Sequence, residues 1–228
     1  MAISFDNSAS YGLTGATSYT QSYTVGSGSN RLLLVWLEFN PAATVSSVTY
    51  AGSSLTQILS HPFSGYSTQY LYALVAPATG ANNLVINVSN KYFWVGAFAG
   101  SYAGCAQANP TNFANATAST NPYTTSLTTG SNNSWVGVFA ADSFSATLSF
   151  NAGTTQRQFV GGMLYGDSNA PVTPAGSFTT SINTGGTGDI VYSTLVEIPP
   201  FAVLDYGVSW SHGINQPSGS WINSIVSV

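Results

Sequence analysis

The sequence has very few charged residues. Lys, Arg, Asp and Glu make up 4% of its 228 residues, with 3 Lys+Arg against 7 Asp+Glu, whereas a soluble domain ordinarily carries about 25%. Three cations are too few to neutralise a phosphate backbone or to hold the chain on an anionic bilayer, which argues against nucleic-acid and membrane binding. Solubility therefore depends on Ser, Thr, Asn and the backbone, and such a surface is not selected to keep copies of the protein apart.

Cysteine and long hydrophobic runs are also scarce. Cys105 is the only cysteine, so no internal disulfide forms. Its surroundings, "AGCA", offer no cation that would lower the pKa of a reactive thiol, and we expect a small buried side chain. The longest apolar run, "RLLLVWLEF" at 31–39, falls far below the ~20 residues of a membrane helix. No cationic stretch followed by an apolar one opens the sequence, so we expect no secretory signal unless one has been removed.

Motifs that carry catalysis are missing as well. His61 and His212 lie 151 residues apart, without the spacing of a zinc site, and no G-x-S-x-G sequence indicates a nucleophile. Four aspartates could form a carboxylate pair for glycoside hydrolysis or a Ca²⁺ site, although turn formation is the favoured interpretation. They are Asp6, Asp142, Asp167 and Asp189. We therefore predict that the protein is not an enzyme, with no catalytic residues, no metal and no cofactor.

Alternation of apolar and polar residues is the dominant pattern, and it predicts β-strands. Examples are "YTQSYTV" (19–25), "TQYLYALV" (68–75), "NLVINVS" (83–89) and "DIVYSTLVEI" (189–198). Turn-forming clusters such as "GSGSN" (26–30) separate the strands, which recur about every 8–14 residues, as is typical of a sandwich or barrel. No helical period extends beyond about two turns. The sequence predicts an all-β, antiparallel two-sheet sandwich over residues 1–200.

A short apolar motif occurs twice, as "WVGAFAG" (94–100) and "WVGVFAA" (135–141). Neither copy alternates with polar residues, which predicts strands buried on both faces. Gly96 and Gly137 would permit a close approach across the sheet or a bulge. We expect two equivalent central strands, one in each half of a sandwich, with Trp94 and Trp135 in or beside the core. An exact duplication of the domain is disfavoured because the similarity fades outside these windows.

Five longer stretches, taken in order, resemble one known kind of domain. They are "VGSGSNRLLLVWLEF" (25–39), "VSSVTYAGSSLTQI" (45–58), "YLYALVAPATGANNLVINVS" (70–89), "AFAGSYAGCAQANP" (97–110) and "GDSNAPVTPAGSFTT" (166–180). Together they are similar to a recurring β-sandwich domain of phage virion proteins and bacterial surface proteins. The resemblance implies a jelly-roll-like antiparallel sandwich in an extracellular or virion setting, and it supplies no catalytic residues.

The segment at 201–228 lies beyond this resemblance. It follows "IPP" (198–200), where Pro199 indicates the end of the last strand. Alternation returns in residues 203–210, before a turn-forming "NQPSGS" (215–220) and a short apolar end. We predict an assembly arm that adds a strand to the sheet edge of a neighbouring copy. Its contact residues would be Leu204, Tyr206, Val208, Trp210 and Trp221. The alternative, in which the segment covers an open edge of its own domain, remains open.

Three functions compete at this stage. The first is a non-enzymatic structural protein of an extracellular assembly. It would be a phage virion component, such as a capsid decoration, head-fibre or tail protein, or a surface filament subunit, and its partners would be copies of itself or other subunits. The second is a glycan-binding module, whose aromatic residues in "HPFSGYSTQY" (61–70) and "NKYFWV" (90–95) would stack on sugar rings. The third, a hydrolase, has no positive signal.

Overall fold

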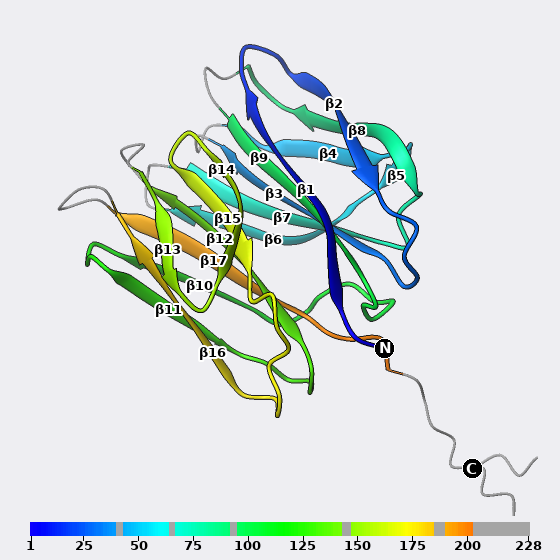
Figure 1. Cartoon of the computed structure of the whole chain (residues 1–228). Helices are drawn as coiled ribbons and strands as arrows, with labels where there is room; N and C mark the ends of the chain where they lie inside the picture. Colours follow the sequence, from blue (N-terminus) through cyan, green and yellow to red (C-terminus); the bar gives the residue numbers. More distant parts are fainter. Residues whose placement is uncertain (40–42, 64–66, 92–94, 143–146, 185–189, 203–228) are drawn as a thin grey trace, which may run out of the picture.

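The computed structural model describes residues 1–39, 43–63, 67–91, 95–142, 147–184 and 190–202, and these residues form strands and turns without a helix (Figure 1). The strands are β1 (Ser4–Leu13), β2 (Ser18–Val25), β3 (Leu32–Phe39), β4 (Val45–Tyr50), β5 (Ser53–Ser54), β6 (Thr56–Phe63), β7 (Ser67–Val75), β8 (Gly80–Val88), β9 (Val95–Ala103), β10 (Phe113–Ala118), β11 (Tyr123–Thr128), β12 (Trp135–Asp142), β13 (Ser149–Ala152), β14 (Thr155–Val160), β15 (Met163–Asp167), β16 (Ser177–Asn183) and β17 (Val191–Ile198). The all-β, antiparallel sandwich class predicted from the sequence is confirmed.

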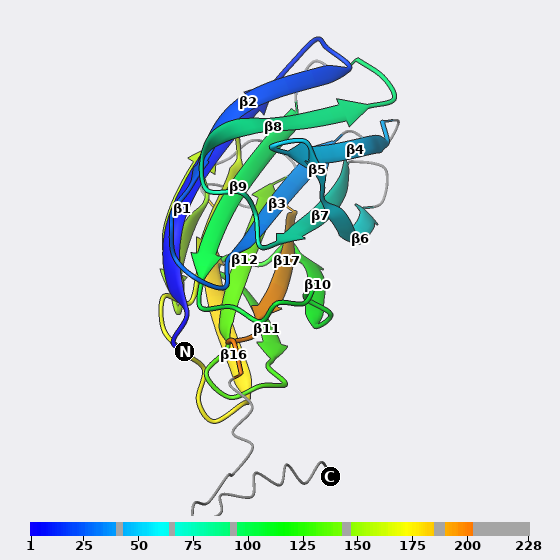
Figure 2. The same cartoon turned by 90° about the vertical axis from the view of Figure 1, so that its right-hand side faces the viewer.

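The described strands form four sheets stacked as layers (Figures 1 and 2). The first outer sheet has the order β2-β8-β4-β5 and packs on the first inner sheet, β1-β9-β3-β7-β6. The second inner sheet, β10-β17-β12-β15-β14, packs on the other face of the first inner sheet and carries the second outer sheet, β11-β16-β13. The sequence predicted one two-sheet sandwich, whereas the chain forms two sandwiches joined through their inner sheets.

Each sandwich is a jelly roll, because its strands pair in nested order. In the first sandwich β1 pairs with β9, β2 with β8, β3 with β7, and β4 with the short β5. In the second, β10 pairs with β17, β11 with β16, and β12 with β15. A long hairpin of nested pairs that rolls up on itself gives two facing antiparallel sheets and two Greek keys.

The two sandwiches have the same topology. When β1 is matched with β10 and the later strands follow in order, the two inner sheets have identical strand orders, and only β5 lacks a counterpart. The left-handed backbone positions match as well: Asn30 (φ 54°) precedes β3 and Asn133 (φ 63°) precedes the matching β12. Likewise, Gly52 (φ 80°) follows β4 and Gly153 (φ 79°) follows the matching β13. The chain therefore contains the same jelly-roll topology twice.

The sequence analysis predicted that the repeated motif lies on two equivalent strands, and that interpretation was wrong. The two copies of the "WVG" motif lie on β9 and β12, which are not equivalent strands, since β9 matches β17 and β12 matches β3. The motifs are alike because both strands belong to inner sheets, where both faces are buried. The two sandwiches share instead the position of left-handed turn residues, such as Asn30 and Asn133, where the backbone conformation restricts the choice of residue.

Burial on both faces is confirmed for the described side chains of these strands. On β12, Phe139 faces the first inner sheet, while Val138 faces the second outer sheet. Gly137 allows the ring of Trp36 to approach, because an added Cβ would lie 3.2 Å from its carbons. Trp135 is buried as predicted; Trp94 lies outside the described residues.

The division of the chain at residue 200 stays a prediction. The described strands begin at Ser4 and end at Ile198. Residues 203–228 lie outside the described part of the chain, and with them the predicted arm residues Leu204, Tyr206, Val208, Trp210 and Trp221.

Candidate functional site

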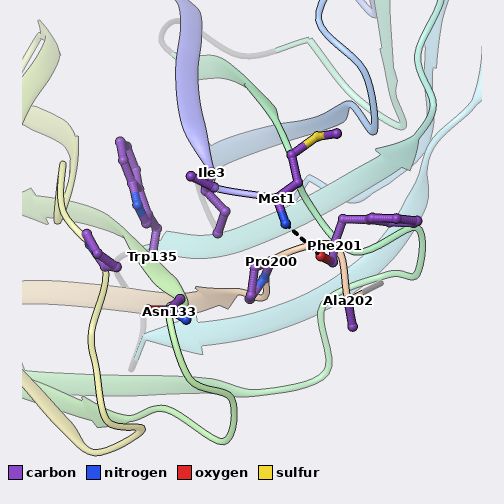
Figure 3. Close-up of a pocket in the computed structure, with 9 residues that line it drawn as sticks. Met1, Ile3, Asn133, Trp135, Pro200, Phe201 and Ala202 are labelled. Carbon is purple, nitrogen blue, oxygen red and sulfur yellow. Dashed lines mark hydrogen bonds between the residues drawn. The ribbon is translucent and has the colours of Figure 1, made fainter. Parts of the chain in front are cut away.

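A pocket of about 540 Å³ lies at the end of the molecule where the chain enters and leaves the fold (Figure 3). Its lining comes from three parts of the sequence: the residues before β1, the turn before β12 with the Pro171 loop, and the residues after β17. The lining residues are Met1, Ala2, Ile3, Asn133, Trp135, Pro171, Pro200, Phe201 and Ala202. Trp135 and Phe201 flank the pocket on opposite sides (Figure 3).

Backbone hydrogen bonds hold the exit of the chain in place. Phe201 N donates to Gly104 O at 2.8 Å, and Ala106 N donates to Pro199 O at 2.8 Å. Cys105 and Pro200 form an isolated antiparallel bridge between these two bonds. The exit segment therefore lies against the linker that joins the two sandwiches, and the first part of the pocket wall is fixed by the main chain.

The opposite wall is built by the turn before β12. Asn133 takes the left-handed conformation and donates its N–H to Val172 O at 2.9 Å. Val172 N donates in turn to Ser134 O at 2.8 Å, which brings Pro171 to the rim. The ring of Trp135, the first residue of β12, packs edge-on against Tyr102 of β9 at 6.3 Å between centroids. The pocket thus has one aromatic wall supported by the core between the sandwiches.

The side chains that line the pocket are mostly apolar. Eight of the nine lining residues have apolar side chains, and Asn133 supplies the only side-chain amide. Among these nine residues the charged group is the α-ammonium of Met1, which donates to Phe201 O at 3.4 Å (Figure 3). A concave, mostly apolar site with few polar atoms suits an apolar side chain or a small apolar ligand.

A buried polar network supports the core beside this pocket. Arg157 makes a two-pronged ion pair with Asp167, with Nε to Oδ2 and Nη2 to Oδ1 both at 2.9 Å. Tyr102 donates its hydroxyl to Asp167 Oδ2 at 3.1 Å and lies 2.5 Å from the hydroxyl of Tyr165. Burial raises the pKa of both tyrosines well above the usual range, and the Asp167 carboxylate adds to the rise. The network links the first sandwich to the second, and the tyrosines stay neutral donors.

A second polar cluster lies between the inner sheets, at the ends of β3 and β7. Gln69 donates its amide to Glu38 Oε2 at 3.3 Å, and the Thr194 hydroxyl lies 2.9 Å from Gln69 Oε1. Burial raises the pKa of Glu38 to about 7, and the nearby Asp142 carboxylate adds to the rise while the Gln69 hydrogen bond opposes it. Glu38 and Asp142 lie on the matching strands β3 and β12, so the repeated topology brings two carboxyl groups together.

This cluster predicts a pH dependence of stability. The folded state holds the Glu38 proton more tightly than the unfolded chain, whose carboxyl titrates near 4.5. The contribution of Glu38 to the free energy of unfolding should therefore be largest below pH 4.5 and fall by on the order of 2–3 kcal/mol as the pH rises through about 7. We expect Glu38→Gln to remove this decrease, as measured by urea denaturation at pH 4.5 and pH 8.

Glu197→Gln is the matched control, because its effect has the opposite sign. Burial raises the pKa of Glu197, but this is outweighed by hydrogen bonds from Gly130 N, Ser131 N, Ser134 Oγ and Asn112 Nδ2, at 2.6–2.9 Å, which hold the pKa below the usual range. Its contribution to stability is present at neutral pH and is lost as the pH falls through that pKa. If Glu38→Gln kept the pH dependence of the natural sequence, Glu38 would not be the titrating group.

The aspartates singled out in the sequence do not form one site among the described residues. Asp6 accepts hydrogen bonds from Gly26 N at 2.8 Å and from Ser101 Oγ at 2.7 Å, so it holds the turn after β2. Asp167 is not a turn residue, since its buried carboxylate pairs with Arg157. Asp142 lies near Glu38, and Asp189 falls outside the described residues.

The other candidate residues that the structure describes, Cys105 and His61, are packed within the fold. Cys105 is buried as predicted, and burial raises the pKa of its thiol to about 12. The His61 ring packs edge-on against Phe63, while His212 lies outside the described residues. In the part of the chain that the structure describes, no three His, Cys, Asp or Glu side chains gather closely enough to hold a metal ion. No helix there is suited to crossing a membrane.

The predicted glycan-binding aromatics divide into two groups. Phe63 and Tyr70 are buried and cannot stack on a sugar. The aromatics at positions 66 and 92–94 lie outside the described residues. Among described positions, the exposed aromatic side chains are Phe113 and Phe159, on the edge strands β10 and β14.

Comparison with known proteins did not identify a family for this chain. No protein-family model matches the chain, and no curated protein is significantly similar to it. The resemblance to virion and surface sandwich domains therefore stays a prediction.

Sequence reasoning missed the pocket because no local pattern encodes it. Ile3 and Pro200 line the same pocket although they lie at opposite ends of the described chain. The one sequence signal was "IPP", which was interpreted only as the end of a strand. The repeated topology had only a weak signal in the sequence, in the turn residues Asn30 and Asn133 that precede the matching strands β3 and β12.

Proposed function

We propose that the protein is a non-enzymatic structural subunit of an extracellular assembly. A phage virion component, such as a capsid decoration, head-fibre or tail protein, is the first choice, and a surface filament subunit is the close variant. The observation that carries the proposal is the pocket of mostly apolar side chains at the point where the described part of the chain ends. A sandwich that exposes such a pocket beside an apolar chain end is suited to joining copies of itself.

The outer faces of the fold support this proposal. The exposed residues of β2 are Ser18, Thr20, Ser22 and Thr24, and those of β11 are Thr124, Ser126 and Thr128. None of them is charged. Packed copies would therefore meet little electrostatic repulsion across these faces, whereas a strongly charged surface keeps subunits apart.

A glycan-binding module is the second candidate. It is favoured by the same hydroxyl-rich outer faces, since hydroxyl groups in regular rows can exchange hydrogen bonds with sugars. Against it, the described aromatics near the predicted binding loops fill the core. Binding to a glycan array by a strictly monomeric protein would favour this candidate over the assembly.

Removal of residues 202–228 tests the proposed function. We expect the protein truncated after Phe201 to be a folded monomer, because the described strands end at Ile198 and the cores do not depend on the missing residues. Light scattering after size exclusion would give its mass, and circular dichroism would report its strand content. The full chain, measured at the same concentrations, should form larger species. An insoluble or unfolded truncated product would contradict the proposal and favour a segment that covers its own domain.

A further inference from the structure

We infer that the pocket beside Trp135 is the acceptor for Trp210 from a second copy of the chain, so that copies join head to tail. The inference rests on the proposed function and names the two contact surfaces of the assembly. It is carried by three observations: the chemistry of the pocket, the composition of residues 203–228, and the place where that segment begins.

The pocket suits a largely apolar occupant. Its lining side chains are apolar apart from Asn133, and its aromatic wall, Trp135, has its ring edge-on to Tyr102. The α-ammonium of Met1, which donates to Phe201 O at 3.4 Å, would repel a second cation but can face an aromatic ring. An indole suits such a site, because it offers a large apolar surface and one N–H donor, and the Asn133 side chain is the amide that can accept that donor.

The C-terminal segment has the matching composition. Residues 203–228 contain one acidic residue, Asp205, no Lys or Arg, and two tryptophans, Trp210 and Trp221. Tryptophan is among the residues that most often dominate the binding energy of protein interfaces. Trp210 ends the apolar side of the alternating stretch that starts at Leu204, and it is the first of the two tryptophans along the segment.

The place where the segment begins favours a second copy over the same chain. The segment follows Ala202, which itself lines the pocket. The sequence between 203 and 210 alternates without proline, which predicts an extended stretch; at about 3.3 Å per residue, Trp210 then lies roughly 26 Å from Ala202. In that predicted conformation the segment would carry Trp210 away from its own pocket and toward that of a neighbour.

This contact has a consequence for the shape of the assembly. The donor surface and the acceptor surface are different parts of the chain, so the interface is heterologous. Such an interface leaves one free segment and one free pocket on every growing oligomer, and it continues into a filament or closes into a ring. A symmetric dimer that used this contact alone would need each segment to reach back to the other chain.

Two full-length variants separate the donor from the acceptor. Trp210→Ala removes the donor and keeps the pocket, while Ala202→Trp fills the pocket and keeps the donor. Ser211→Ala and Ala202→Ser are the matched controls, since neither removes an aromatic ring or fills the space. We expect sedimentation velocity to show concentration-dependent oligomers for the natural sequence and both controls, and at least a tenfold weaker association for each of the two test variants.

Mixing the two test variants gives the decisive result. A chain without the donor and a chain without the acceptor can still make one contact with each other. We therefore expect a one-to-one mixture to form a heterodimer that grows no further, although each variant alone stays monomeric. Two monomeric variants that fail to combine would overturn the pairing of Trp210 with this pocket.

A competition experiment with a peptide tests the same contact without requiring the Ala202→Trp variant to fold. The probe is a synthetic peptide of residues 203–214, and its control carries alanine in place of Trp210. The first should dissociate oligomers of the natural sequence, and the second should not. If Trp210→Ala assembled as well as the natural sequence, the inference would fail while the proposed function stood. If the natural sequence stayed monomeric at every concentration, both would fail.

Discussion

Replacing Phe139 with alanine should lower the free energy of unfolding by about 3–5 kcal/mol. Phe139 of β12 has no exposed surface, and its ring lies edge-on to Phe98 of β9 at 5.7 Å between centroids. The pair lies at the centre of the contact between the two inner sheets, where little can move to fill a cavity. Phe98→Ala should have a similar effect, as measured by urea denaturation at constant pH.

Phe159→Ala is the matched control for these two substitutions. Phe159 lies on β14 of the same inner sheet and is 39% exposed. Its removal should therefore cost much less, within about 1 kcal/mol. A loss below about 1 kcal/mol at both Phe98 and Phe139 would mean that the two sandwiches do not pack through these rings.

The second large effect is expected at the buried ion pair. Arg157→Ala should destabilise the protein by about 3–5 kcal/mol, because it leaves the carboxylate of Asp167 buried and without its cation. The Asp167 side chain has no exposed surface, and that of Arg157 is 14% exposed. The guanidinium also lies 3.9 Å from the centre of the Phe5 ring, so its removal takes away a cation–π contact as well.

The Arg157→Lys variant shows how much of the stabilisation comes from the positive charge and how much from the two hydrogen bonds of the guanidinium. Lysine keeps the positive charge but cannot make the two parallel hydrogen bonds of the guanidinium, so we expect an intermediate loss of stability. Thermal and urea unfolding of the natural sequence and the two variants would measure the series. Equal stability of Arg157→Ala and the natural sequence would show that Asp167 finds another partner or is protonated.

The losses of stability predicted for Phe139→Ala and Arg157→Ala both arise at the joint between the sandwiches, where the two inner sheets pack together. This joint also supports the proposed binding site. Trp135, the aromatic wall of the pocket, contacts Tyr102, which donates to Asp167. The stability of the joint and the shape of the pocket are therefore coupled through one network. Variants that test assembly should be chosen outside this network, as Ala202 is.

The sequence by itself determined the class of the fold. Strand-forming alternation in "YTQSYTV" and the turns around it predicted β2, since the period of side chains along a strand is a local property of the chain. The absence of polar residues in "WVGVFAA" predicted a strand buried on both faces, and β12 is such a strand. Cys105 was predicted to be buried because its neighbours offer nothing to activate it.

Only the tertiary structure decided how those strands combine. Nested pairing joins β1 to β9 and β10 to β17, so the pairs that define each jelly roll lie far apart in the sequence. The pairing of strands is settled by which arrangement buries the most apolar surface, and no local pattern carries that information. For the same reason the repeated topology, the approach of Glu38 to Asp142 and the pocket between Ile3, Trp135 and Pro200 emerged only with the packed sheets.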